Sequence, residues 1–271
     1  MCVSCLYNEL LLAASTRTTL ECPPAPVPVT RPLAAGINIH AYEASRPGLC
    51  VCVWEAACLP LRIMHIFTEK EIGNLIDALP SETVLSAMAD GFKAYSAGQV
   101  SVAPIQTLGQ PPLANFIGHK DAQACIKSAY LNGGEHFVAK VASGGGGLNS
   151  GLMLIFSQRN FAPVAILCDG GLLTELRTAA AGALAFRHLA PSTVSQIAVI
   201  GCGIQARWQL RLIASVTGCR HVCTWARRKE QATAFAAEMR ELGWTVTVCA
   251  SAQHACSAAE VVLTVTPARE P

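Results

Sequence analysis

The sequence predicts an α/β protein whose last third builds a doubly wound parallel sheet and whose middle part builds an α+β unit. Three observations indicate this class. From about Ser195 onward, strand-like and helix-like segments alternate strictly. A glycine-rich turn joins the first strand of that series to its first helix. Several short strand-like runs precede the series, with one long Ala-rich helix between them and it.

The composition is that of a folded protein with small-molecule partners. Of the 271 residues, 52% are hydrophobic and 14% are charged, and the mean hydropathy is +0.38, so overall disorder is excluded. A formal net charge of +2 gives no electrostatic reason to expect a nucleic acid or a membrane as partner. Uncharged apolar runs are too short to span a membrane, and Leu10–Ala14 is too short for a signal peptide. We therefore expect a cytoplasmic protein.

Three regions follow from the pattern. Residues 1–63 carry no sustained helical or strand period and contain the proline cluster Pro23–Pro28, so we expect an irregular or disordered leader there. Residues 64–191 form the α+β domain and residues 192–271 the start of the parallel-sheet domain. The leader also holds a CxxC and a CxC, which together offer four thiols for zinc. The second spacing is unusual and no histidine pair follows, so we expect no metal site; the four residues are Cys2, Cys5, Cys50 and Cys52.

The α+β domain is predicted to begin with two helices. Thr68-Glu69-Lys70-Glu71 is a capping box that opens the first helix, and Pro80 ends it. The second runs from about Glu82 to Gly98. Short strands without intervening helices follow, which predicts an antiparallel sheet; they are Val102–Leu108, Leu113–Gly118, Ala124–Tyr130, His136–Ala142, Leu152–Ser157 and Pro163–Asp169. A helix from Leu172 to Leu189 closes the domain.

The alternating region predicts four parallel strands with right-handed crossovers. The strands are Gln196–Ile200, His221–Trp225, Thr245–Cys249 and Glu260–Val265, and the helices are Ile204–Val216, one that ends at Leu242, and Ala252–Ser257. A complete doubly wound sheet has about six strands. We therefore expect the sheet of this chain to be incomplete.

The turn after the first of these strands matches the dinucleotide-binding fingerprint G-x-G-x-x-A of Rossmann domains. Gly201 permits the tight turn, Gly203 lets the backbone approach a pyrophosphate, and Ala206 allows close packing of helix on strand. The phosphates would then lie on the amide groups at the helix N-terminus, which adds Ile204 and Gln205 to the candidate cofactor residues. Thr266, just after the fourth strand, is a further candidate.

The end of the second strand favours NADP(H), with NAD(H) as the alternative. An NAD site usually has an acidic side chain there for the ribose hydroxyls. This chain has none at that place and offers Arg227 and Arg228, whose guanidinium groups suit a phosphate. The simpler interpretation is that both arginines start a solvated helix.

Three charged residues in the α+β domain are candidates for substrate chemistry. Lys140 lies on a strand with Val138 and Ala142 on the same face, where burial would lower its pKa, although a surface lysine is the simpler interpretation. Lys127 raises the same question on the neighbouring strand. Arg177 lies one turn into an Ala-rich helix and is either a surface arginine or a bidentate ligand for a carboxylate.

The stretch Asp169–Ala183 resembles the signature helix of the ornithine cyclodeaminase/μ-crystallin family, and Phe137–Gly144 and Val199–Arg207 resemble two further motifs of that family in the same order. The resemblance runs from about Met64 to Pro271. It implies a Rossmann domain for NAD(P) and a substrate domain that also forms a homodimer. It implies an active-site role for Lys140 and a substrate-carboxylate role for Arg177.

The resemblance also implies the reaction class: reduction of imines of amino acids, oxidation of amino acids, or cyclisation of ornithine. The family often has a second arginine where this chain has Gln106, and Lys127 is the candidate to replace its charge. A later acidic residue and the final strands of the family are expected beyond Pro271, so we expect a truncated chain. The alternative function is a catalytically inactive, crystallin-like protein that binds NADP(H) and a small acid.

Overall fold

The computed structural model describes residues 29–32, 38–41, 64–109, 123–145 and 148–268. Within the first 63 residues it contains an antiparallel pair of strands, β1 (Val29–Pro32) and β2 (Asn38–Ala41), which belongs to a compact unit of its own. The expectation of a wholly irregular leader is therefore wrong for these two strands, which are too short to give a periodic pattern. The proline cluster Pro23–Pro28 and the four leader cysteines lie outside the described residues.

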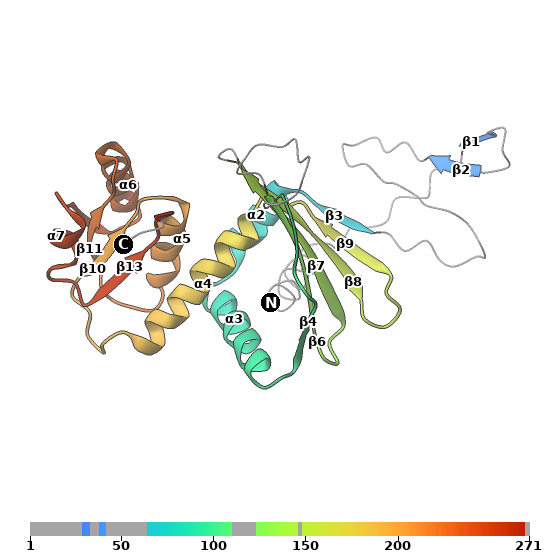
Figure 1. The fold of residues 1–271 in the computed structure, drawn as a ribbon, viewed down its shortest axis with the longest axis horizontal. Helices are drawn as coiled ribbons and strands as arrows, with labels where there is room; N and C mark the ends of the chain where they lie inside the picture. Colours follow the sequence, from blue (N-terminus) through green and yellow to red (C-terminus); the bar gives the residue numbers. More distant parts are fainter. Residues whose placement is uncertain (1–28, 33–37, 42–63, 110–122, 146–147, 269–271) are drawn as a thin grey trace. The chain divides into compact units, whose positions relative to one another are not determined.

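A mixed sheet of seven strands forms the first part of the larger unit (Figure 1). Its path runs β3-β9-β8-β7-β6-β4, and β5 pairs with β6. All pairs are antiparallel except β3 with β9, which are parallel. The strands are β3 (His65–Phe67), β4 (Val100–Val102), β5 (Gln106–Leu108), β6 (Gln123–Leu131), β7 (His136–Gly145), β8 (Leu148–Ser157) and β9 (Pro163–Leu167).

Two strand predictions need correction. The predicted strand Val102–Leu108 is two strands, β4 and β5, because Pro104 between them has no N–H to donate to a ladder. Strand β3 was not predicted, since three residues are too few for a periodic pattern, and its parallel pairing makes the sheet mixed rather than antiparallel. The predicted strand Leu113–Gly118 lies outside the described residues.

Three helices pack together beside this sheet: α2 (Glu69–Ala78), α3 (Ser81–Ser96) and α4 (Leu172–Leu189). The predicted capping box is present: the Thr68 hydroxyl accepts from the Glu71 N–H at 3.3 Å, and the Glu71 carboxylate accepts from the Thr68 N–H at 2.8 Å. Helix α4 has the predicted bounds, and three of its alanines, Ala179, Ala180 and Ala183, are fully buried. No helix among the described residues is long and apolar enough to cross a bilayer.

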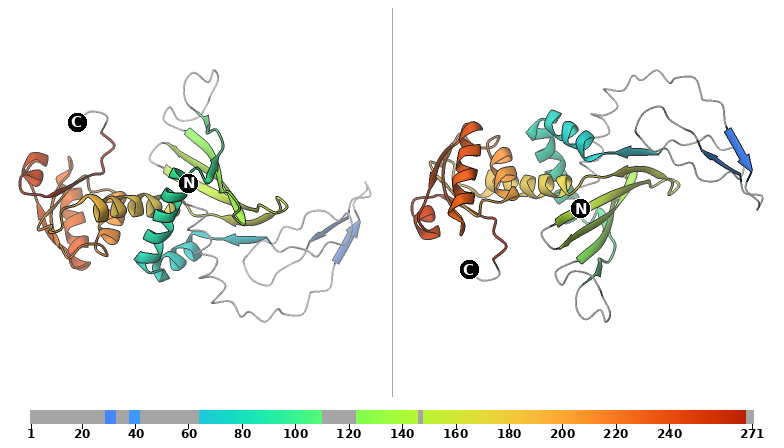
Figure 2. Two further views of the ribbon diagram at one scale, coloured as in Figure 1. Left: turned by 90° about the horizontal axis from the view of Figure 1, so that it is seen from below. Right: turned by 90° about the horizontal axis from the view of Figure 1, so that it is seen from above.

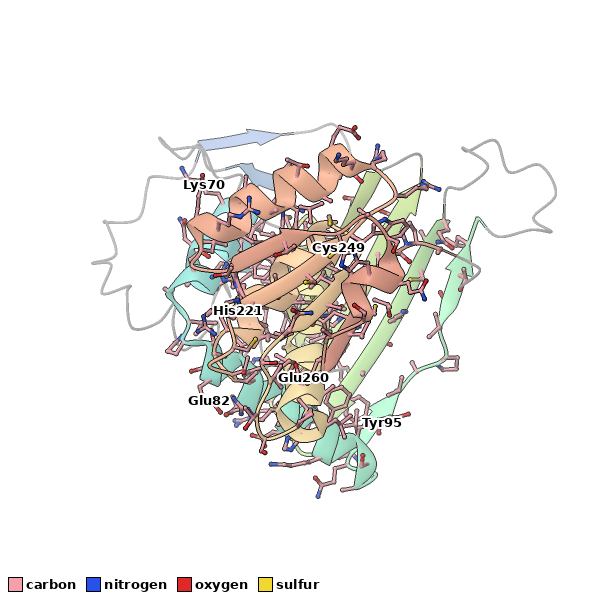
Figure 3. The ribbon with its side chains drawn as sticks, turned by 90° about the vertical axis from the view of Figure 1, so that its left-hand side faces the viewer. Lys70, Glu82, Tyr95, His221, Cys249 and Glu260 are labelled. Carbon is pink, nitrogen blue, oxygen red and sulfur yellow. The ribbon has the colours of Figure 1, made fainter. Side chains whose placement is uncertain are left out.

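The second part of the larger unit is a sheet of four parallel strands in the order β12-β11-β10-β13, with helices on both sides (Figure 2). Its elements are β10 (Ile197–Ile200), α5 (Ile204–Ile213), β11 (His221–Trp225), α6 (Lys229–Glu241), β12 (Thr245–Val248), α7 (Ala252–Cys256) and β13 (Val261–Thr264). The Glu260 carboxylate, labelled in Figure 3, accepts hydrogen bonds from the Ser195 hydroxyl at 2.6 Å and from the Gln196 N–H at 2.9 Å. These bonds join the start of β10 to the start of the edge strand β13.

Candidate functional site

Lys140 and Lys127 face each other directly across the β6–β7 ladder, so both side chains leave the same face of the sheet. Lys127 is exposed, whereas Lys140 is half-buried and its Nζ donates a hydrogen bond to the hydroxyl of Thr174 on α4. Like charges placed directly opposite each other in a sheet are destabilising. The pair therefore favours an anion on this face.

The pKa of Lys140 lies below its usual range. Burial lowers the pKa most, because it disfavours the charged ammonium, and the positive charge of Arg177 lowers it further. The carboxylate of Asp169 acts in the opposite direction, and Lys127 adds a smaller lowering. Lys140 is thus the residue of this group whose environment suits proton transfer.

Asp169 is a site residue that the sequence analysis did not single out. Its side chain is 1% exposed, and its Oδ2 accepts a hydrogen bond of 3.0 Å from the Leu173 N–H at the start of α4. Burial raises the pKa of Asp169, while that bond and the charge of Lys140 act the other way. The sequence signal was an acid just before Gly170-Gly171 at a predicted helix start, where Gly171 has no side chain to cap the helix.

Arg177 is exposed on α4, and it lies near enough to Lys140 for its positive charge to lower the pKa of that lysine. Among the described residues it forms no ion pair. Gln106 is not brought to this place: β5 pairs Gln106 with Ile126 and Thr107 with Cys125. Because side chains alternate along a strand, Thr107 rather than Gln106 shares the sheet face of Lys127 and Lys140.

The glycine-rich turn joins β10 to α5 as predicted. Gly201 has φ +100°, and a Cβ there would lie 2.7 Å from the Val265 carbonyl oxygen and 3.0 Å from Cγ2 of Thr266. A Cβ at Gly203, in contrast, would meet no atom within 4 Å. Ala206 is fully buried. The loop therefore combines a turn that needs glycine with open space at the second glycine, which is what a dinucleotide requires.

The other predicted cofactor residues gather at the same edge of the sheet, because the carboxyl ends of parallel strands meet there. Thr266 follows β13 and lies against Gly201. Arg227 and Arg228 follow β11 and are both exposed, and the backbone of Arg228 caps α6. The structure thus brings Thr266 next to the loop and places the two arginines at the end of the adjacent strand.

Gln205 connects the loop to the lysine site. Its Nε2 donates hydrogen bonds to the backbone oxygen of Glu175 at 3.2 Å and to the Glu175 carboxylate. Glu175 lies on α4 between Thr174 and Arg177. The first turn of α5 is therefore adjacent to the first turn of α4, whereas Ile204 beside Gln205 is 54% exposed.

Two other features of the described residues do not form an alternative site. A groove of about 400 Å³ lies between α4 and β13, but none of the predicted site residues lines it and most of its wall is apolar. Within the described part of the chain, no cluster of three or more His, Cys, Asp or Glu side chains could hold a metal ion. The candidate site described here is therefore the group around Lys140 at the start of α4.

The four-strand order and the glycine loop define a Rossmann-type α/β protein with an adjoining mixed sheet. Residues 142–271 match the family model described as the ornithine cyclodeaminase/mu-crystallin family. A protein named as a dehydrogenase in Rhizobium meliloti is 33% identical over 77% of this chain and 63% of its own length. The ketimine reductase mu-crystallin of Rattus norvegicus is 34% identical over 44% of this chain and 37% of its own length. The chain belongs to the ornithine cyclodeaminase/mu-crystallin family.

A solved structure supports the same fold. An archaeal alanine dehydrogenase dimer with bound NAD has a TM-score of 0.67 and 26% identity, over 77% of this chain and 62% of that one. The chain spans about 63% of the length of the first relative.

Proposed function

We propose that the protein is an NADP(H)-dependent oxidoreductase that acts on the carbon–nitrogen bond of α-imino or amino acids, as a ketimine reductase or an ornithine cyclodeaminase does. The observation that carries this proposal is the half-buried Lys140, held by Thr174 beside the exposed Arg177 and joined to the glycine loop through Gln205 and Glu175. The names of the relatives support the reaction class.

In this proposal Arg177 and Lys127 bind the substrate, and Lys140 transfers a proton. The guanidinium of Arg177 binds the substrate carboxylate through two parallel hydrogen bonds, and Lys127 supplies a second positive charge on the same side of the sheet. Lys140 holds the proton that the substrate nitrogen gains on reduction, and its lowered pKa makes it a better donor at neutral pH. A bound nicotinamide supplies the hydride.

The cofactor preference rests on the end of β11. Arg227 and Arg228 are exposed there, and a 2′-phosphate would gain charge-assisted hydrogen bonds from them. Replacing both by alanine is expected to weaken NADPH by about tenfold or more while NADH changes little. Arg159→Ala, at an exposed ion pair with Glu135, is the matched control. Tighter binding of NADH than NADPH to the unchanged protein would contradict the preference.

The reaction is tested by turnover of a panel of cyclic ketimines and amino acids with NADPH or NADP⁺. Lys140→Ala is expected to abolish turnover and leave cofactor affinity nearly unchanged, whereas Lys93→Ala, at an exposed ion pair with Asp90, is expected to keep both. Binding of cofactor and small acids without turnover of any member would favour the crystallin-like binding protein instead.

The assembly is also a proposal. The archaeal alanine dehydrogenase is described as a dimer, and we expect the same of this protein. Light scattering after size-exclusion chromatography is expected to give about twice the chain mass of 28.5 kDa. A mass of one chain at micromolar concentration would contradict a homodimer.

A further inference from the structure

Arg207, in the first turn of α5, makes contacts that the glycine motif does not require. Its Nη1 donates hydrogen bonds to the carbonyl oxygens of Cys202 at 2.8 Å and Gly203 at 3.1 Å. Its Nε donates to Oε2 of Glu238 on α6 at 2.6 Å, and its guanidinium carbon lies 5.5 Å from the ring centre of the buried Phe235. One side chain thus joins the loop to the next helix.

Arg207 puts a positive charge close to the N-terminus of α5. The N-terminus of a helix carries the positive end of the helix dipole, so an arginine there is unfavourable unless it is compensated. Glu238 compensates the charge, and the loop carbonyls accept the remaining contacts. The guanidinium is therefore occupied by the protein itself rather than directed to a phosphate.

The geometry of the peptide group gives these contacts a consequence. In a planar trans peptide the C=O and the following N–H point in opposite directions. Holding the carbonyls of Cys202 and Gly203 toward Arg207 turns the N–H groups of Gly203 and Ile204 to the other side. Within the described residues neither of these N–H groups donates a hydrogen bond.

We propose that Arg207 is a positioning residue for the dinucleotide: its hydrogen bonds to two loop carbonyls direct the N–H groups of Gly203 and Ile204 toward the cofactor pyrophosphate. The proposal rests on the proposed cofactor function, because the amides serve a purpose only if a dinucleotide binds there. It assigns Arg207 no contact with the cofactor.

The first measurement needs no cofactor. Arg207→Met keeps the apolar stem over Phe235 but removes the donors, so amide hydrogen exchange at Gly201, whose N–H donates to the Trp225 carbonyl oxygen at 2.9 Å, is expected to speed up by about tenfold. Glu238→Gln is the matched variant: it removes the ion pair but leaves the guanidinium on the carbonyls, so exchange in the loop should stay within about twofold. Unchanged exchange in Arg207→Met would overturn the proposal.

The second measurement uses NADPH and NADH titrations of the full chain. Arg207→Met is expected to weaken both cofactors by the same factor, about tenfold, because the pyrophosphate is common to both. A loss confined to NADPH would mean that Arg207 binds the 2′-phosphate directly, and unchanged affinities would mean that the loop is shaped without it; either result overturns the proposal. If the unchanged protein binds neither cofactor, the proposed function fails, while hydrogen exchange still decides whether Arg207 orders the loop.

Discussion

Substitutions at the two glycines of the β10–α5 loop are expected to have different effects, one on the stability of the fold and the other on binding of the proposed cofactor. At Gly201 the backbone has φ +100°, and a methyl group would lie 2.7 Å from the Val265 carbonyl oxygen. The left-handed backbone costs about 1–2 kcal/mol for alanine, and overpacking costs about 1–3 kcal/mol. Gly201→Ala is therefore expected to lower the free energy of unfolding by about 2–5 kcal/mol, which lowers Tm by about 5–15 °C.

At Gly203 the same substitution is expected to leave stability nearly unchanged and to weaken cofactor binding. The backbone φ is −85°, which alanine adopts readily, and no atom lies within 4 Å of the added carbon. Alanine is a poorer N-cap than glycine, which costs about 0.5–1 kcal/mol. Alanine also reduces the conformational entropy of the unfolded chain, which stabilises the fold by about 0.4–1 kcal/mol. Stability should stay within about 1 kcal/mol of the unchanged protein. The methyl group would fill the space that a pyrophosphate needs, so NADPH affinity should fall by about tenfold or more.

Thermal melts and NADPH fluorescence titrations on the two variants check this pair of outcomes. If Gly203→Ala binds NADPH as the unchanged protein does, the open space beside Gly203 is not where a pyrophosphate lies. If Gly201→Ala melts with the unchanged protein, the close approach to Val265 is relieved at little cost, and the steric argument is wrong.

Three further substitutions address the lysine site. Arg177→Lys is expected to raise KM for the imino acid by about tenfold with little change in kcat, because a point charge replaces a bidentate ligand; a fall in kcat alone would contradict it. Lys140→Met should change the pH dependence of stability: the pKa of Lys140 in the folded protein lies below its ordinary 10.5, so the cost of its buried charge is full below that lowered pKa and vanishes as pH rises toward 10.5. The advantage of methionine in urea unfolding should therefore shrink with pH, and a constant difference would refute it. Asp169→Asn keeps an acceptor for the Leu173 N–H but removes the charge that raises the pKa of Lys140, so the alkaline limb of the pH–rate profile should move to lower pH; an unmoved limb would show that Asp169 serves only the helix.

Most of the fold could be predicted from patterns among residues that are close in the sequence. The capping box at Thr68 and the alternation after Ser195 each depend on residues close in sequence, so the helix starts and the parallel strands could be predicted. Strand β3 could not, because its three residues form a strand only by pairing with β9, about 100 residues later in the chain. Pro104 did carry a signal, a missing N–H within a predicted strand, that would have divided Val102–Leu108.

The site residues divide in the same way. Gly201 and Gly203 follow from a motif whose spacing reflects local backbone geometry, and the structure puts them in that geometry. The charge environment of Lys140 depends on register and on α4, so neither its Thr174 partner nor the role of Asp169 could be predicted from its own strand. Gln106 shows the reverse case: it stands where the family often has an arginine in the sequence, but the β5–β6 register pairs it with Ile126 and so puts it on the sheet face opposite to Lys127.

Helices α4 and α5 pack closely against each other at Gly182. A Cβ at Gly182 would lie 2.0 Å from Oε1 of Gln209, a side chain that is 7% exposed. The Nε2 of Gln209 donates to the Thr178 carbonyl oxygen at 3.4 Å, while its buried Oε1 has no partner among the described residues. Gly182→Ala gains about 1 kcal/mol of helix propensity but must displace this amide at a cost of about 1–3 kcal/mol, so a net loss of up to about 2 kcal/mol is expected.

Replacing both residues tests whether steric overlap is the cause. Gln209→Ala frees the space and removes the unpaired oxygen, so Gly182→Ala in that background should be neutral or stabilising, with a coupling energy of about 1–3 kcal/mol. Gly73→Ala on α2 is the matched control, because its Cβ would meet only Cδ1 of Leu172, at 3.9 Å, and the substitution should stabilise by about 0.5–1 kcal/mol. Urea unfolding of the unchanged protein and of these four variants measures these terms. Additive losses from Gly182→Ala and Gln209→Ala would mean that α5 moves away from α4 instead of reorienting Gln209, and the close crossing would then have little energetic weight.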